Sequence, residues 1–202
     1  MKHTLFLYLF LITTMCLLSQ EKQILLFPDG APGESVKLKQ VDDLSGGKVA
    51  GCPVLRISNV SEPALTFYPA PADNNSGVTI IVNPGGGYNI LAYNLEGTEI
   101  CKRFNGYGIN CVLVKYRVPR REGLEMYEAP LQDVQRAIAY TRSHAKYWNI
   151  NPDKIGVLGF SAGAHLSAVA STNYRNRTYP RVDSNDDVSL RPDFSVLAYP
   201  AY

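Results

Sequence analysis

Runs of apolar residues separated by polar stretches organise the chain and predict a series of strands. Four short runs, rich in β-branched residues, predict strands buried on both faces: residues 78–82, 111–114, 155–158 and 194–199. Ahead of them, residues 53–60 and 64–68 alternate between apolar and polar positions, which is typical of antiparallel strands at the edge of a sheet. The pattern therefore predicts a mostly parallel sheet with antiparallel N-terminal strands.

The segments between these runs predict helices. Residues 95–104 carry apolar side chains along one side, and a second helix is expected to begin near Pro130, because proline suits a first helical turn. A third helix, made of small residues, is expected from Ser161 to about Ser171. Strands that alternate with helices indicate an α/β fold in which the sheet is doubly wound, with helices on both faces.

The first nineteen residues differ from the rest and predict a signal peptide, which leaves residues 20–202 as the folded domain. Lys2 and His3 precede an apolar stretch from Leu5 to Leu18, and the small residue Ser19 stands before a polar break. A membrane anchor is the alternative, but a spanning helix needs about 20 apolar residues and this stretch is shorter. We expect a periplasmic or secreted protein that has no membrane contact once the signal is removed.

The sequence contains four cysteines. Cys16 would leave with the signal peptide; lipidation there is a minor alternative, because Met15 is larger than the residue that normally precedes a lipidated cysteine. Cys52, Cys101 and Cys111 remain, and no C-x-x-C spacing indicates a metal or redox site. The apolar neighbours of Cys101 and Cys111 favour buried free thiols, and a disulfide between these two residues is the alternative.

The charge balance argues against a partner that is a polyanion. The sequence has 20 basic and 18 acidic residues, a formal net charge of +2 and no run of like charges. Such a balance offers no basic face of the kind that binds nucleic acid. With 46% hydrophobic residues, the 202-residue chain has the composition of one packed domain.

The motif Gly159-Phe160-Ser161-Ala162-Gly163 is the strongest indication of chemistry. A buried strand leads into this G-x-S-x-G sequence and a helix leaves it, which is the setting of a nucleophilic serine on a sharp, strained turn. Ligands of open α/β sheets bind at the carboxyl ends of strands, where Ser161 is expected. The flanking glycines avoid collisions of a Cβ atom with neighbouring elements. Ser161 is the candidate nucleophile, and an ordinary tight turn is the alternative.

A second motif, Pro84-Gly85-Gly86-Gly87-Tyr88, follows the first buried strand. Three consecutive glycines cost backbone entropy, so a folded loop needs a reason to keep them. Ester hydrolysis supplies one, because its tetrahedral intermediate carries an oxyanion that fixed N–H groups stabilise and that only a bare backbone can approach. We expect the donors to be the N–H groups of Gly86, Gly87 and Ala162, the residue after the serine. A flexible surface turn is the alternative.

Together these motifs resemble the α/β-hydrolases, and in particular the hormone-sensitive-lipase-like branch that includes secreted bacterial acetyl-xylan and feruloyl esterases. The resemblance covers most of the chain after the signal and rests on residues 29–33, 84–88, 115–117, 129–133, 159–165 and 191–194. Pro84 stands where lipase-like relatives have histidine, which is usual in the polysaccharide-esterase branch. The resemblance implies a serine esterase that removes acetyl or similar acyl groups from plant polysaccharide such as xylan through an acyl-enzyme, without a metal or an organic cofactor.

A serine nucleophile needs a general base and a carboxylate that orients it, and in this fold both follow the serine, the acid before the histidine. His165 lies four residues after Ser161, along the helix, where a structural role is expected. His144 precedes the serine, near the end of a helix. We therefore expect the catalytic acid and base beyond Tyr202, in a chain that is the N-terminal portion of a longer esterase and whose sheet is truncated after the strand near Tyr199.

The carboxylates of the chain offer no replacement for the missing acid. Asp133 lies in a predicted helix, where pairing with Arg136 or contact with solvent is expected. A polar stretch that carries three further aspartates predicts a solvated loop: Asp183, Asp186 and Asp187. Asp193 precedes the last strand instead of following one. None of these aspartates both follows Ser161 and precedes a histidine, so none matches the expected order of a triad.

Several alternatives remain open from the sequence. A serine peptidase or a small-amide hydrolase would share the fold and the serine turn, and a non-catalytic relic would keep the fold without the triad. Tyr88 and Tyr93 would either line a sugar-stacking surface or pack in the core. Acyl and sugar preference depend on loops that vary within one fold, so the substrate and the oligomeric state are not determined.

Overall fold

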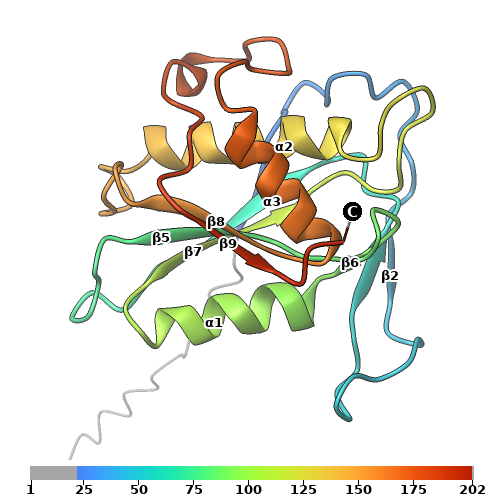
Figure 1. The fold of residues 1–202 in the computed structure, drawn as a ribbon, viewed down its shortest axis with the longest axis horizontal. Coiled ribbons are helices and arrows are strands. Elements are labelled where there is room, and N and C mark those ends of the chain that lie inside the picture. The colour runs from blue at the N-terminus through green and yellow to red at the C-terminus, as the bar shows by residue number, and fades with distance from the viewer. Residues whose placement is uncertain (1–21, 202) are drawn as a thin grey trace, which may run out of the picture.

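A six-stranded sheet forms the centre of the computed structural model, which describes residues 22–201 (Figure 1). In spatial order its strands are β1 (Gln23–Leu25), β4 (Ala64–Tyr68), β7 (Asn110–Lys115), β5 (Thr79–Asn83), β8 (Ile155–Phe160) and β9 (Ser195–Ala198). The pairs β7–β5, β5–β8 and β8–β9 are parallel, whereas β1–β4 and β4–β7 are antiparallel. The predicted sheet, mostly parallel with antiparallel N-terminal strands, is confirmed.

The predicted signal peptide and Cys16 lie outside the described residues. Within residues 22–201, no helix is both long enough and apolar enough to cross a membrane.

Helices cover both faces of the sheet, as the doubly wound fold requires. The helical segments are η1, a π-helical turn (Asn94–Thr98), α1 (Glu99–Asn105), α2 (Glu128–Ser143), α3 (Ala162–Thr172) and η2, a 3₁₀ turn (Ser184–Asp186). Figure 1 shows α1 on one face of the sheet and α2 and α3 on the other. The segment predicted as one helix over 95–104 is thus divided into η1 and α1. Gly97 of η1 packs so closely on Leu113 that an added Cβ would lie 2.8 Å from its Cδ1 atom.

The N-terminal strands differ from the prediction in their placement. A separate three-stranded antiparallel sheet contains β2 (Val41–Asp43), β3 (Arg56–Ser58) and β6 (Leu91–Ala92). The predicted strand 53–60 therefore contributes to this small sheet, not to the edge of the large one. The predicted strand 64–68 is β4, which lies inside the large sheet because β1 covers its outer side.

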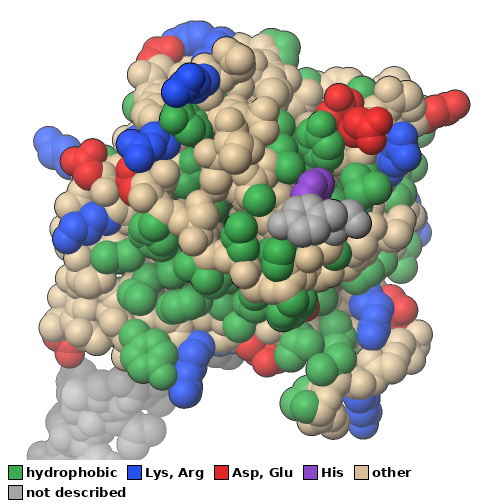
Figure 2. Space-filling view, viewed as in Figure 1, with side chains coloured by type: hydrophobic (Ala, Val, Ile, Leu, Met, Phe, Trp, Pro, Cys, Tyr) green, Lys and Arg blue, Asp and Glu red, His purple; other side chains and the backbone are tan. Residues whose placement is uncertain are grey.

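The last strand, β9, is exposed, although its apolar composition predicted a strand buried on both faces. Val196 is 43% exposed and Leu197 is 41% exposed. The reason is position, since β9 is at the edge of the sheet and pairs only with β8 among residues 22–201. Figure 2 shows apolar side chains gathered on the face of the molecule where β9 and α1 lie.

Arg117, two residues after the end of β7, is buried and connects three separate segments of the sequence. Its guanidinium donates to Asp133 at 2.9 to 3.1 Å, to the carbonyl oxygen of Pro32 at 2.7 Å and to that of Ala129 at 2.9 Å. The Arg117 amide also donates to Asp133 at 2.8 Å. Residues 29–33, 115–117 and 129–133, three of the segments that carry the family resemblance, thus meet at one ion pair. The prediction that Asp133 pairs with Arg136 or with solvent is wrong.

Arg136 pairs instead with the aspartates of the segment after α3. Its guanidinium donates to Asp183 at 2.7 Å and to Asp186 at 2.8 Å. These hydrogen bonds lower the pKa of Asp183 to about 2. Asp186 is 4% exposed and also accepts from the Tyr179 hydroxyl at 2.5 Å. The predicted solvated loop is therefore wrong for Asp186, while Asp187 does lie at the surface, paired with Arg181.

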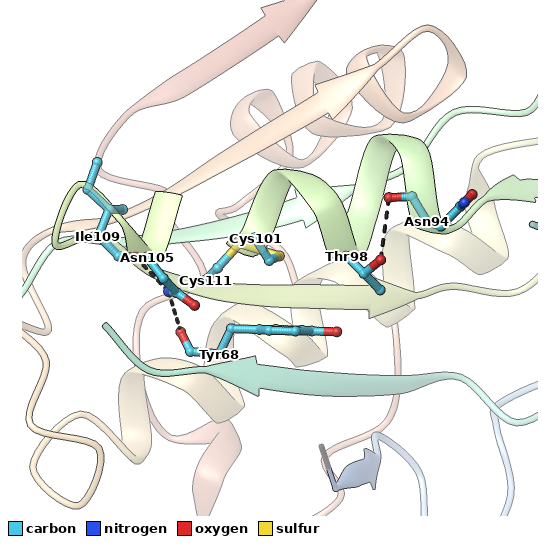
Figure 3. Close-up of a disulfide and its surroundings, with 7 residues drawn as sticks. All are labelled: Tyr68, Asn94, Thr98, Cys101, Asn105, Ile109 and Cys111. Carbon is cyan, nitrogen blue, oxygen red and sulfur yellow. Dashed lines mark hydrogen bonds between the residues drawn. A yellow bond between two sulfur atoms is a disulfide. The ribbon is translucent and has the colours of Figure 1, made fainter. Parts of the chain in front are cut away.

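Cys101 of α1 and Cys111 of β7 form a disulfide, so the prediction of free thiols is wrong (Figure 3). Their Cα atoms lie 5.3 Å apart, within the usual range for a disulfide. Asn105, on the same helix, donates to the carbonyl oxygens of Tyr68 and Ile109, both at 3.0 Å. The disulfide and these hydrogen bonds fix α1 on the sheet.

We expect the thiol chemistry of the folded protein to reflect this pairing. Without reductant, iodoacetamide should modify Cys52, which is exposed, and spare Cys101 and Cys111. Reduction should lower the free energy of unfolding by about 2–3 kcal/mol. The disulfide closes a short loop that restricts the unfolded chain, and reduction restores the lost conformational entropy. Mass spectrometry and denaturant titration measure the two effects, and Cys52→Ser is the matched control that keeps the response to reductant. Alkylation of Cys101 before reduction would contradict the pairing.

Candidate active site

Ser161 occupies a strained turn between β8 and α3, as the motif predicts. Its φ of 50° and ψ of −118° lie in a region that residues other than glycine rarely adopt. The Ser161 amide donates to the carbonyl oxygen of Ala198 at 3.0 Å, and its carbonyl oxygen accepts from Ala164 at 3.0 Å and His165 at 3.1 Å. The side chain is half-buried at the carboxyl end of β8. The backbone thus holds Ser161 firmly in an unfavourable conformation.

The glycines on either side of this turn are required by close backbone contacts. A Cβ on Gly159 would collide with the backbone of Gly163 and Ala164. A Cβ on Gly163 would collide with the carbonyl oxygen of Asn83 and lie 2.6 Å from that of Pro84. Glycine at these positions therefore allows α3 to lie directly against the end of β5.

The triple-glycine loop leaves the sheet beside the serine turn. β5 and β8 are paired with Asn83 opposite Gly159, so both segments emerge from the same edge of the sheet. A Cβ on Gly85 would lie 3.1 Å from the Cβ of Ser161. The glycine loop and the serine turn therefore lie side by side.

Several hydrogen bonds hold the glycine loop in the conformation that the structure shows. Gly86 and Gly87 have φ values of 138° and 62°, and Tyr88 follows with 58°. The Gly86 carbonyl oxygen accepts from the amides of Asn89 and Ile90, both at 3.1 Å. At the start of the loop, the carbonyl oxygen of Pro84 accepts from the Tyr116 hydroxyl at 2.5 Å. Such a loop can present backbone N–H groups in fixed directions.

Three amides near Ser161 remain available for a bound anion. Within residues 22–201, the N–H groups of Gly86, Gly87 and Ala162 donate to no other residue. Ala162 opens α3, an 11-residue helix, and the positive end of the helix dipole favours negative charge there. This arrangement is suited to an anion that forms beside the Ser161 hydroxyl.

The two histidines among residues 22–201 make contacts other than one to Ser161. His165 Nδ1 lies 2.9 Å from the Tyr88 hydroxyl, and its ring packs edge-on against Tyr127. His144 stacks on Tyr140 at the end of α2. No hydrogen bond joins the Ser161 hydroxyl to a histidine in this part of the chain. The expected structural role of His165 is consistent with these contacts.

Tyr88 and Tyr93 belong to the core. They are 3% and 7% exposed, so the alternative of a sugar-stacking surface is wrong for both. Burial raises the pKa of the Tyr88 hydroxyl, which therefore stays protonated. Tyr88 thus anchors the end of the glycine loop to α3 through His165.

Glu96 is a site residue that the sequence analysis did not identify. It lies in η1, and its Oε2 atom accepts from the Gly85 amide at 2.6 Å. Its Oε1 atom accepts from the Tyr199 hydroxyl at 2.8 Å. Among residues 22–201, no group of three or more histidine, cysteine, aspartate or glutamate side chains is placed to hold a metal ion. Its two hydrogen bonds give the Glu96 carboxylate a structural role, which only contacts between distant segments reveal.

The chain is similar in sequence to a known family and to two curated proteins. A model of the BD-FAE family matches residues 65–198. The chain is 38% identical over 128 residues to an acetylxylan esterase of Xylanibacter ruminicola, a match that covers 63% of this chain and 23% of that protein. It is 31% identical over 124 residues to endo-1,4-beta-xylanase B of Butyrivibrio fibrisolvens, covering 60% and 19% of the two proteins.

A solved structure shows the same fold. The acetyl ester-xyloside bifunctional hydrolase of Caldicellulosiruptor lactoaceticus superposes with a TM-score of 0.63 and 32% identity, over 89% of this chain and 57% of that one. The chain spans about a quarter or less of the two curated relatives and just over half of this solved relative. Because the family model matches well over half of its residues, the chain belongs to the BD-FAE family of α/β hydrolases.

Proposed function

We propose that this protein is a serine carboxylic-ester hydrolase that deacetylates xylan or a related plant polysaccharide. The observation that carries the proposal is the strained Ser161 turn, which lies beside the glycine loop and the start of α3. The relatives named as an acetylxylan esterase and an acetyl ester-xyloside hydrolase support this substrate class.

In the proposed reaction, the Ser161 hydroxyl oxygen attacks the ester carbonyl carbon and its proton passes to a general base. The oxyanion that forms is held by the N–H groups of Gly86, Gly87 and Ala162, which stabilise charge developed in the transition state. Collapse expels the sugar alcohol, which receives the proton, and leaves an acetyl-Ser161 ester. Water then attacks this ester with the same assistance and releases acetate.

The general base and its orienting acid complete the proposal. Because His165 is bonded to Tyr88 and His144 is stacked on Tyr140, we propose that the base and acid come from sequence after Tyr202. On this proposal the 202 residues alone are inactive. We also propose that the protein acts in the periplasm or outside the cell, where polysaccharide is found; cell fractionation tests this location.

Two measurements test the proposed function: hydrolysis of a panel of substrates and labelling of the serine with a fluorophosphonate probe. The full-length gene product should release acetate from acetylated xylo-oligosaccharides, leave peptides and small amides intact, and react with a fluorophosphonate probe at Ser161. Peptide or amide cleavage without ester turnover would indicate a different hydrolase on the same fold. A folded protein that neither turns over esters nor takes the label would be a non-catalytic relic, and the proposal would be wrong.

A further inference from the structure

Glu96 joins two segments that border the serine turn. One carboxylate oxygen accepts from the Gly85 amide at 2.6 Å, and the other accepts from the Tyr199 hydroxyl at 2.8 Å. Hydrogen bonds to an ionised carboxylate are among the stronger ones in proteins. The carboxylate therefore links the first amide of the glycine loop to the residue that directly follows β9.

These contacts lie next to the reacting atoms. A Cβ on Gly85 would lie 2.8 Å from Glu96 Oε2, 2.6 Å from the carbonyl oxygen of Phe160 and 3.1 Å from the Cβ of Ser161. A negative charge so close to an oxyanion would by itself disfavour it. A favourable effect of Glu96 must offset this repulsion. Its two hydrogen bonds provide such an effect, because they hold the glycine loop in place.

The segment that carries Glu96 is itself fixed. The side chain of Asn94, at the start of η1, donates to the carbonyl oxygen of Pro53 at 2.9 Å and accepts from the Leu55 amide at 2.7 Å. Gly97 packs on Leu113, as described above. π-Helical turns are often found at functional sites. Here the turn places the Glu96 carboxylate against the glycine loop.

Tyr199 connects Glu96 to the segment that precedes Ser161. Its ring packs on Phe160 with centroids 5.9 Å apart, and the preceding residue, Ala198, accepts from the Ser161 amide at 3.0 Å. Tyr199 is 63% exposed, and partial desolvation, the hydrogen bond to Glu96 and the charge of that residue together raise its pKa to about 12. The hydroxyl therefore stays protonated and remains a donor to Glu96 at neutral pH.

We infer that Glu96, oriented by Tyr199, is a positioning residue that holds the glycine-loop amides at the correct distance from Ser161. The Gly85 amide donates its hydrogen bond to Glu96, and the amides of Gly86 and Gly87 are then free to face an oxyanion. This inference rests on the proposed function, because the oxyanion exists only if Ser161 attacks an ester.

The test compares variants of the full-length gene product in acetyl-ester hydrolysis. Glu96→Ala should lower kcat by about 10²- to 10³-fold, similar to the loss of one oxyanion donor, with KM changed by less than about threefold. Glu96→Gln should restore most of kcat, because its amide oxygen still accepts from Gly85 while the Tyr199 hydroxyl can accept from its amino group. Tyr199→Phe should fall between these two. Glu99→Ala, at an exposed position three residues further on, is the matched control and should behave as wild type.

A second measurement separates positioning from a general loss of structure. A trifluoromethyl ketone forms a hemiketal oxyanion with an active serine, so its affinity should fall in Glu96→Ala in proportion to kcat/KM. The thermal unfolding midpoint of the variant should stay near that of wild type. Wild-type kcat in Glu96→Ala would overturn the inference, and so would equal inactivity of Glu96→Gln, which would mean that the charge itself takes part in the chemistry. Absence of ester turnover in wild type would instead overturn the proposed function, and the inference with it.

Discussion

Replacing Ser161 with alanine is expected to lower kcat for acetyl-ester hydrolysis by roughly 10⁴- to 10⁶-fold in the full-length gene product. Alanine removes the attacking oxygen but leaves the amides of the glycine loop and Ala162 in place. The residual rate should therefore exceed that of water alone, because those amides still stabilise an oxyanion. Initial rates of acetate release measure the effect. Ser171→Ala, in α3 and one residue from the end of that helix, is the matched control.

The same position offers an independent check through stability. Ser161 has a φ of 50°, which glycine adopts with little strain. Ser161→Gly should therefore be as inactive as Ser161→Ala, yet unfold at a higher temperature than the alanine variant. Strained catalytic positions usually lower the stability of the fold. If Ser161→Ala kept more than a tenth of the wild-type kcat, Ser161 would not be the nucleophile.

Asp133→Asn is expected to destabilise the fold by about 3–5 kcal/mol, because it removes the closest counter-charge of the buried Arg117 guanidinium and leaves only Glu34, 3.9 Å away. Both side chains are almost completely buried, and their nitrogen and oxygen atoms lie 2.9 Å apart. The variant would also place an amide N–H₂ group against N–H donors of Arg117. Urea titration followed by circular dichroism gives the change in the free energy of unfolding.

The exposed pair Arg181 and Asp187 provides the control for this prediction. Their side chains are 50% and 56% exposed, and the separation of their charged atoms is 2.7 Å. Water screens such a pair, so Asp187→Asn should leave the urea midpoint unchanged within error. Equal effects of Asp133→Asn and Asp187→Asn would show that burial does not set the strength of the Arg117 ion pair.

The sequence predicted those features that depend on neighbouring residues. The buried strands β5, β7 and β8 are marked by unbroken apolar runs, and the serine turn by five consecutive residues. The order of a strand within its sheet is not a local property. For that reason β9 has the composition of a central strand but the exposure of an edge strand.

Contacts between distant segments account for the errors. Helical spacing placed Asp133 near Arg136, but Asp133 faces Arg117 on the adjacent strand end, and Arg136 reaches Asp186 fifty residues away. Whether Cys101 and Cys111 pair depends on the distance between their Cα atoms, which spacing in the sequence does not give. Glu96 was missed for the same reason, because its importance lies in reaching Gly85.

The contact of Gly163 with the carbonyl oxygens of Asn83 and Pro84 has a consequence for how such an enzyme can change. The start of α3, which directly follows the proposed nucleophile, meets the end of β5 there through main-chain atoms, with no side chain between them. Exchanges of side chains on the outer loops leave that backbone contact unaltered. Changes in the surrounding loops can therefore alter the preference for an acyl group or a sugar, while the backbone contact between α3 and β5 stays the same.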